Sequence, residues 1–179
     1  MEPEKIIEKY YIKGSEAYRV LIHHSRQVAD KALSIAKLHP EMNLDLRFIE
    51  EAALLHDIGI IYCDAPAIGC YGTFPYICHG YLGADMLIKE GFPRHALVCE
   101  RHTGTGISIE MIKESNLPLP HRDFLPVSLE EQLICFADKF FSKTKQAQEM
   151  DIWAIQQSLS RYGDETVWRF QNWVTCFLG

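Results

Sequence analysis

The sequence predicts an all-α fold in a single domain. Apolar residues recur at helical spacing along most of the 179 residues, and no stretch alternates like a half-buried strand. Glycine or proline interrupts the chain at intervals typical of short helices. The composition, 47% hydrophobic and 23% charged, is that of an ordinary globular protein. No repeat or linker divides the chain, so residues 1–179 are expected to form one domain.

Charge and composition disfavour several classes of protein. The chain has 18 Lys and Arg against 24 Asp and Glu, a net charge of −6, and no basic cluster, so nucleic acid is not an expected partner. We find no stretch long enough to span a membrane and no secretory signal at the start. Six scattered cysteines without a CxxC pair are typical of reduced thiols. We therefore expect a cytoplasmic protein with a small-molecule partner; a homodimer is one option for its assembly.

Two helices are expected at the start of the chain. Pro3 opens a short helix that Gly14 closes, and a longer helix covers about 15–38, before Pro40. His24 lies on the apolar face of this longer helix. A lone histidine in that position is more often a hydrogen-bonded core residue than a ligand.

The third helix carries two side chains that can bind metal. Asp45 caps its start, its alanines and leucines favour helix, and Gly59 is expected to close it in a left-handed conformation. His56 and Asp57 then lie in its last turn. A buried carboxylate is costly unless a cation or hydrogen bonds compensate, so Asp57 needs a partner. On these residues alone, a pair that faces water is an equal alternative.

A long irregular segment, Gly59 to Cys78, follows this helix. It contains two prolines, three glycines and four aromatic residues. Such stretches usually form lids or binding loops. We expect a lid whose aromatic side chains shape a pocket, and a short helix is the alternative. The aromatic residues are Tyr62, Tyr71, Phe74 and Tyr76.

Further helices follow the predicted lid. One starts near His79 and stops at Gly91, and the next runs from Pro93 to His102, where a Thr-Gly-Thr-Gly turn ends it. Because Gly91-Phe92-Pro93 is a compact stop and restart, these two helices can lie side by side and bring both histidines together.

The last part of the chain is also expected to be helical. A short segment lies around 109–112, and Ser128-Leu129-Glu130-Glu131 is a capping box that opens the helix of Asp138. Two helices within 150–178 are expected to pack on the motif-bearing core of about 20–143. Their tryptophans are predicted to be packing residues: Trp153, Trp168 and Trp173.

Six polar side chains share a position on or at the end of a predicted helix. They are His24, His56, Asp57, His79, His102 and Asp138. Each alone could be a satisfied core residue, but six polar groups in one small core are costly unless they share a partner. A metal centre would be such a partner. Imidazole and carboxylate ligands suit Fe, Mn, Co, Ni or Zn, and the lack of thiolate ligands argues against a closed structural zinc site.

The motifs around these residues resemble those of the HD superfamily of metal-dependent phosphohydrolases. The match spans roughly 21–143, and the Ile-Gly after His-Asp is the pattern of the HDIG subset. The resemblance implies an all-α HD-type domain whose motif residues bind metal. The motifs stand in the family's order: His24-Ser25, Leu55-His56-Asp57-Ile58-Gly59 and Ala137-Asp138-Lys139.

Two further motifs are similar to those of six-ligand members with two metals, which include the HD-type symmetrical diadenosine tetraphosphate hydrolases. They are His79-Gly80-Tyr81-Leu82-Gly83-Ala84 and Arg101-His102-Thr103-Gly104. This likeness implies one metal on His24, His56, Asp57 and Asp138. It implies a second metal on His79 and His102, with Asp57 bridging.

The resemblance implies hydrolysis of a phosphate ester or anhydride, of a nucleotide or a related small molecule, by a hydroxide held between the metals. Iron is the leading candidate among one or two divalent ions per chain, ahead of Mn, Co, Ni, Zn or Mg. The Tyr and Pro that complete the family's cyclic-di-GMP phosphodiesterase motif are replaced by Ile60 and Ile61. The exact substrate therefore stays open.

Neighbours of the motif residues are candidates for catalysis and substrate binding, because cations stabilise phosphoryl transfer electrostatically. The catalytic candidates are Asp57, Lys139 and Arg101. The substrate-binding candidates are Lys139, Lys143, Thr103 and Tyr76. Solvated surface charge is an equal alternative for Lys143, and turn formation explains Thr103 as well.

Two other classes of function fit the same residues. Some HD-fold proteins with this ligand set are similar to inositol and phosphonate oxygenases, so a di-iron oxygenase is one alternative. A nucleotide-binding sensor without turnover is the other, because no lysine follows Gly59 where many HD enzymes have a basic residue.

Overall fold

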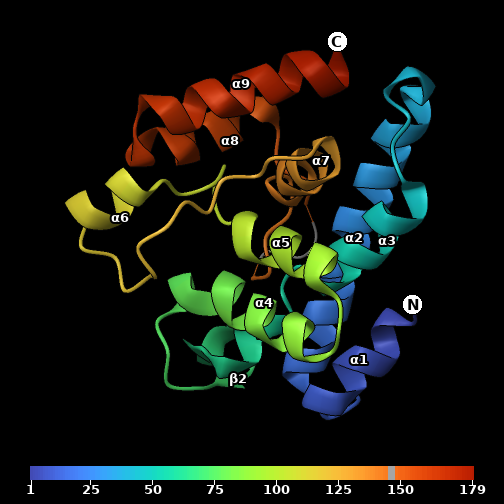
Figure 1. Ribbon diagram of the computed structural model, residues 1–179, viewed down its shortest axis with the longest axis vertical. Helices are drawn as coiled ribbons and strands as arrows, with labels where there is room; N and C mark the ends of the chain where they lie inside the picture. Colours follow the sequence, from blue (N-terminus) through green and yellow to red (C-terminus); the bar gives the residue numbers. More distant parts are fainter. Residues whose placement is uncertain (145–147) are drawn as a thin grey trace.

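The computed structural model describes residues 1–144 and 148–179 and shows a helical fold with one very small hairpin (Figure 1). The predicted all-α, single-domain fold is confirmed. The α-helices are α1 (Pro3–Tyr10), α2 (Glu16–Leu38), α3 (Leu46–Leu55), α4 (His79–Lys89), α5 (Pro93–Arg101), α6 (Ile109–Glu114), α7 (Leu129–Asp138), α8 (Ile152–Leu159) and α9 (Asp164–Leu178). In the described part of the chain, no helix has both the length and the apolar character of a membrane span.

Short 3-10 turns and two strands connect the helices. The strands β1 (Asp64–Ala65) and β2 (Cys70–Tyr71) pair antiparallel, with Asp64 opposite Tyr71. They lie in the predicted lid, which is therefore a chain of tight turns around a hairpin. The turns are η1 (Pro40–Met42), η2 (Ile58–Tyr62), η3 (Pro66–Ile68), η4 (Tyr76–Cys78) and η5 (Ser160–Tyr162).

Side-chain caps begin several of the helices. Asp45 accepts the backbone N–H of Phe48 at the start of α3, as predicted. The Ser128 hydroxyl accepts the N–H of Glu131 at the start of α7. The Ser128 half of the predicted capping box is therefore formed. The Glu131 carboxylate accepts the N–H of Val127 instead of the N–H of Ser128.

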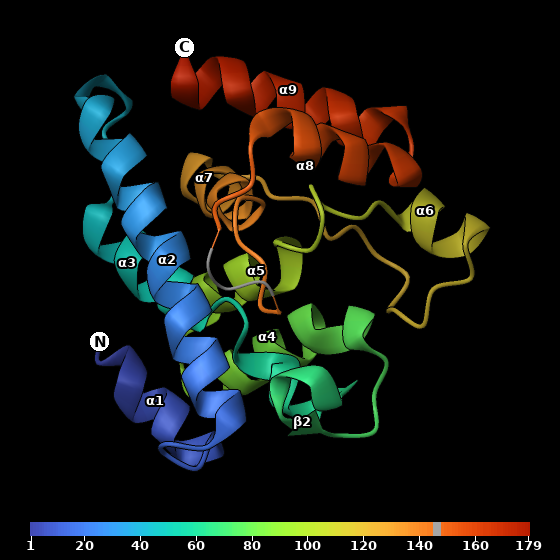
Figure 2. The ribbon, with the colours of Figure 1, turned by 180° about the vertical axis from the view of Figure 1, so that it is seen from behind.

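Helix α7 packs against α2, α3, α5 and α9. In Figures 1 and 2, α2 and α3 lie beside it, α5 lies below it and α9 lies above it. One apolar cluster fills the space among α2, α3, α7 and α9, and contains Phe136, Phe170 and Phe177. A second joins α1, α2, α4 and α5 and contains Ile7, Leu21 and Leu87. The two clusters fix the ends of α3, α5 and α7 close to the middle of α2.

Gly59 has a different role from the one predicted. Helix α3 ends at Leu55, and Gly59 lies in η2 without a left-handed conformation. A Cβ on Gly59 would lie 2.2 Å from the carbonyl oxygen of His79 and 2.4 Å from the nitrogen of Gly83. The glycine is therefore needed because the main chain after Asp57 packs directly on helix α4.

Replacing Gly59 with alanine is expected to destabilise the fold by at least about 2 kcal/mol, because the clash is with backbone atoms. Gly91→Ala is the matched control. A Cβ there has open space, and only the positive φ of +86° opposes it, at a cost of about 1 kcal/mol. Urea unfolding measures both free energies. Equal losses in the two variants would contradict the packing role of Gly59.

The C-terminal tryptophans differ from the prediction in two cases out of three. Trp173 is buried and its Nε1 donates to Gln132 Oε1. Trp153 and Trp168 are 69% and 64% exposed. The helical pattern of α8 and α9 is amphipathic, but it did not identify which aromatic residues face the core.

Candidate metal centre

Four of the six predicted ligands meet between α2, α3 and α7. His24 comes from the middle of α2, His56 and Asp57 follow α3, and Asp138 ends α7. His24 Nε2 lies 2.9 Å from Asp138 Oδ1 and 3.2 Å from Asp57 Oδ2. His56 Nε2 lies 3.1 Å from Asp57 Oδ2 and 3.4 Å from Asp138 Oδ1. One donor atom from each residue lies within 4.8 Å of the others, so the group can hold a metal ion.

The other two predicted ligands form a second group with Asp57. His79 starts α4 and His102 follows α5, and their Nε2 atoms are 3.0 Å apart. These atoms lie 3.4 and 3.3 Å from Asp57 Oδ1. The two oxygens of Asp57 thus face different histidine pairs. The structure brings all six residues together, in the two groups that the resemblance implies.

Backbone hydrogen bonds orient three of the histidine rings. The Nδ1 atoms of His56, His79 and His102 each lie within hydrogen-bond distance of the carbonyl oxygen three residues earlier, at 2.6, 2.7 and 2.7 Å. An Nδ1–H that donates to a carbonyl leaves the Nε2 lone pair for a metal, which is how ligand histidines are commonly held.

Several atoms of the centre are buried without a hydrogen bond of normal geometry. Among the described residues these include His56 Nε2 and Asp57 Oδ1. Buried polar atoms are seldom left without such a partner. The unsatisfied atoms are the imidazole and carboxylate donors that divalent metals take, so the donor set fits a metal ion.

The charges within the centre shift its pKa values strongly. Burial opposes charge on His56, but the Asp57 and Asp138 carboxylates outweigh it and raise the pKa of His56 to about 9. Burial would also raise the pKa of Asp57, but His56 and Lys143 hold it well below its usual range. Burial and the neighbouring His102 lower the pKa of His79 to about 3. A lowered pKa favours the neutral imidazole, which is the form that binds a metal.

Two lysines border the centre. Lys143 Nζ lies 2.6 Å from Asp57 Oδ2, and Lys139 Nζ lies 2.8 Å from Asp138 Oδ2. The side chains are only 14% and 12% exposed. The Asp57 carboxylate outweighs the effect of burial and raises the pKa of Lys143. Both predicted substrate-binding lysines therefore belong to the site, and Lys143 is not a solvated surface charge.

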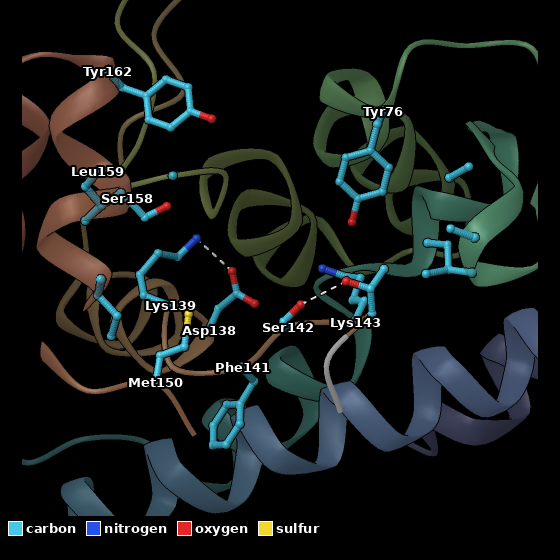
Figure 3. Close-up of a pocket in the computed structure, with 16 residues that line it drawn as sticks. Tyr76, Asp138, Lys139, Phe141, Ser142, Lys143, Met150, Ser158, Leu159 and Tyr162 are labelled. Atoms are coloured by element: carbon cyan, nitrogen blue, oxygen red, sulfur yellow. Dashed lines mark hydrogen bonds and ion pairs between the residues drawn. The ribbon is translucent and has the colours of Figure 1, made fainter. Parts of the chain in front are cut away.

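A pocket of about 600 Å³ opens beside the centre (Figure 3). Its floor includes Asp138, Lys139 and Lys143. One wall comes from the lid segment and contains Ala65, Ile68 and Tyr76. The opposite wall comes from α8 and η5 and contains Ser158, Leu159 and Tyr162. The pocket therefore combines a cationic floor with largely apolar walls.

Two predicted site residues lie elsewhere. Arg101 Nη1 is bound to Glu131 Oε2 at 2.9 Å, and neither Arg101 nor Thr103 is among the described residues that line the pocket. Of the lid aromatic residues, Tyr76 lines the pocket. The other three lid aromatic residues do not line the pocket, and each residue is at least 41% exposed: Tyr62, Tyr71 and Phe74.

The wall formed by α8 and η5 was not predicted from the sequence. Ser158 and Tyr162 are four residues apart, which places two hydroxyl groups on the same face of a helical segment. That spacing occurs on many surface helices, so only the position of α8 over the end of α7 identifies the pair as pocket residues.

The ligand groups lie in the part of the chain that matches a known family, whereas the pocket wall from α8 and η5 lies beyond it. The model of the family described as HD domain matches residues 21–142. The chain belongs to the HD domain family. The match includes all six residues of the metal centre, and it supports the predicted relation to metal-dependent phosphohydrolases.

Three relatives contain a region similar to this HD domain. The chain is 31% identical over 157 residues to a tRNA (cytidine(56)-2'-O)-methyltransferase of Thermoplasma volcanium, covering 87% of this chain and 39% of that protein. It is 32% identical over 132 residues to a protein of the same name from Picrophilus torridus, covering 73% and 34%. It is 33% identical over 135 residues to an uncharacterized protein of Methanocaldococcus jannaschii, covering 74% and 72%.

The alignment thus spans less than half the length of both methyltransferases. No solved structure matches the chain significantly.

Proposed function

We propose that this protein is a metal-dependent phosphohydrolase that acts on a nucleotide or a related small phosphate ester or anhydride. The main support is the arrangement of the two ligand groups, which share Asp57 and adjoin a pocket with Lys139 and Lys143 on its floor. Divalent ions bound there would activate a water molecule and polarise a phosphoryl group.

The proposed ligands form a site with two unequal halves. His24, His56, Asp57 and Asp138 supply four donors, whereas the other half has His79 and His102 with the shared Asp57. A half with fewer protein donors has more room for water or substrate oxygens. Nitrogen and oxygen donors suit iron, the leading candidate, and also Mn, Co, Ni, Zn or Mg, with one or two ions per chain.

The chain's own residues then orient and stabilise the substrate. The Lys139 ammonium stays close to Asp138 and offers positive charge at the floor of the pocket. Asp57 and its histidines are buried, so bulk water has little access to the proposed metal ligands. Tyr76 and Tyr162, on opposite walls in Figure 3, can contact the group attached to the phosphate.

The size of the pocket supports a small substrate. A volume of about 600 Å³ lies within the range of sites for small molecules and cofactors. Of the described lining residues, only Lys139 and Lys143 are basic, and both face carboxylates. A nucleic-acid groove would need a longer row of cations. Most of each methyltransferase lies outside the match, so we assign no methyl transfer to this chain.

The test is metal analysis of anaerobically purified protein, followed by a phosphate-release screen. The screen covers mononucleotides, dinucleoside polyphosphates and a phosphorylated RNA oligonucleotide. We expect bound metal and release from a small nucleotide. Release from the RNA alone would contradict the small-molecule substrate. Oxygen consumption without phosphate release would contradict hydrolysis and favour the di-iron oxygenase.

Replacing Tyr76 with alanine is expected to raise KM about tenfold and change kcat by less than about threefold, because the ring contacts the leaving group and not the phosphate. Tyr71→Ala is the matched control, since Tyr71 is in the same segment but is 75% exposed and outside the pocket. The Tyr76 ring also stacks on His79, so metal content is measured in parallel. Equal kinetics in both variants would remove Tyr76 from the substrate site.

A further inference from the structure

The two pocket lysines contact the metal centre in different ways. Lys139 Nζ is 2.8 Å from Asp138 Oδ2. The histidines approach the other oxygen of that carboxylate, with His24 Nε2 2.9 Å and His56 Nε2 3.4 Å from Oδ1. Lys139 therefore contacts Oδ2 and not Oδ1, the oxygen that a metal ion between the His24 and His56 rings would bind.

Lys143 instead contacts the oxygen that faces the histidines. Its Nζ is 2.6 Å from Asp57 Oδ2. The same oxygen lies 3.2 Å from His24 Nε2 and 3.1 Å from His56 Nε2. The Asp57 side chain is 0% exposed, so the ammonium of Lys143 places a full positive charge at a buried ligand atom.

A metal ion and this ammonium would repel each other strongly. A carboxylate oxygen binds a metal such as zinc at about 2.0 to 2.2 Å. An ion on Asp57 Oδ2 would therefore be less than about 5 Å from Lys143 Nζ in its present position, in buried surroundings where salt screens little. The ion and the ammonium are thus competitors for the same carboxylate oxygen.

We propose that Lys143 is a built-in competitor of the metal ion. Its ammonium compensates Asp57 in the metal-free protein and moves into the pocket when the ion binds. The inference rests on the metal centre of the proposed function. Since Lys143 already lines the pocket with Lys139, the displaced ammonium would meet the phosphate of the substrate. Metal loading would thereby complete the phosphate site.

The test compares Lys143→Met with Lys139→Met in Mn²⁺ titrations of the metal-free proteins by calorimetry. Lys143→Met is expected to bind Mn²⁺ at least about tenfold more tightly than the wild type, because no ammonium has to leave a buried partner. Lys139→Met is expected to bind within about threefold of the wild type or more weakly. Lys143→Arg keeps the charge and should show no gain in affinity.

Thermal unfolding gives a second readout. Metal-free Lys143→Met should melt below the metal-free wild type, because Asp57 has lost a cation, and added Mn²⁺ should restore most of the difference. If Lys143→Met does not fold without metal, Lys143→Gln keeps a polar side chain and is measured instead.

The outcomes separate this inference from the proposed function. If the wild type binds Mn²⁺ and Lys143→Met binds it equally or more weakly, the competition is refuted and the metal centre stands. An equal gain in both methionine variants would indicate a general charge effect and would also refute it. If the wild type binds no divalent metal, the metal centre of the proposed function fails as well.

Discussion

Replacing Asp57 with asparagine is expected to remove bound metal and to lower phosphate release by at least about a thousandfold. The reason is that Asp57 belongs to both ligand groups: Oδ2 faces His24 and His56, and Oδ1 faces His79 and His102. An amide keeps the shape but loses the negative charge that both ions would share. Metal analysis and a phosphate-release assay measure the two losses.

Asp45→Asn is the matched control for this variant. Asp45 lies at the start of the same helix, caps it and pairs with Arg94 at the surface. Asparagine caps a helix about as well as aspartate, so metal content and activity should stay at the wild-type level. An Asp57→Asn protein with full metal content and near-normal turnover would refute the shared carboxylate.

Replacing His79 or His102 with alanine is expected to lower the metal content from about two ions to about one per chain. Each substitution removes a donor from the smaller group and leaves the four donors of the other group in place. Hydrolysis should fall at least about a hundredfold, while the circular dichroism of the helices stays unchanged. Metal analysis of the purified variants counts the ions.

His95→Ala controls for the loss of a histidine from α5. His95 packs on Phe48, and its Nε2 lies 3.3 Å from Glu51 Oε2, so it has no part in either ligand group. A wild type with one ion that both ligand variants retain would indicate a mononuclear enzyme. His79 and His102 would then be substrate contacts.

The sequence predicted the all-α fold and the six residues that converge. Each of the six lies on or beside a helix end within a motif, and helical spacing shows that His24 and Asp138 face inward. What spacing cannot predict is which atom faces which neighbour. The division of the Asp57 oxygens between two histidine pairs depends on how α2, α4 and α5 pack, and only the structure provides that.

Proximity in sequence identified only part of the pocket: the described lining residues include Lys139 and Lys143 but not Arg101 or Thr103. Arg101 precedes His102, but consecutive residues of a helix point about 100° apart, and the arginine reaches Glu131 instead. Lys143 could equally be a surface charge on sequence grounds, yet its ammonium lies at Asp57. The wall with Ser158 and Tyr162 has no motif, so its role follows from tertiary packing alone.

The contact of Gly59 with Gly83 also determines which side of the centre can change its dimensions. Two main chains touch there with no side chain between them, so no rotamer change can widen the gap between Asp57 and the helix of His79. Lys143, by contrast, contacts Asp57 through a long side chain with several rotatable bonds. We therefore expect the centre to be rigid toward α4, and ions of different size to be accommodated by movement of the Lys143 side chain.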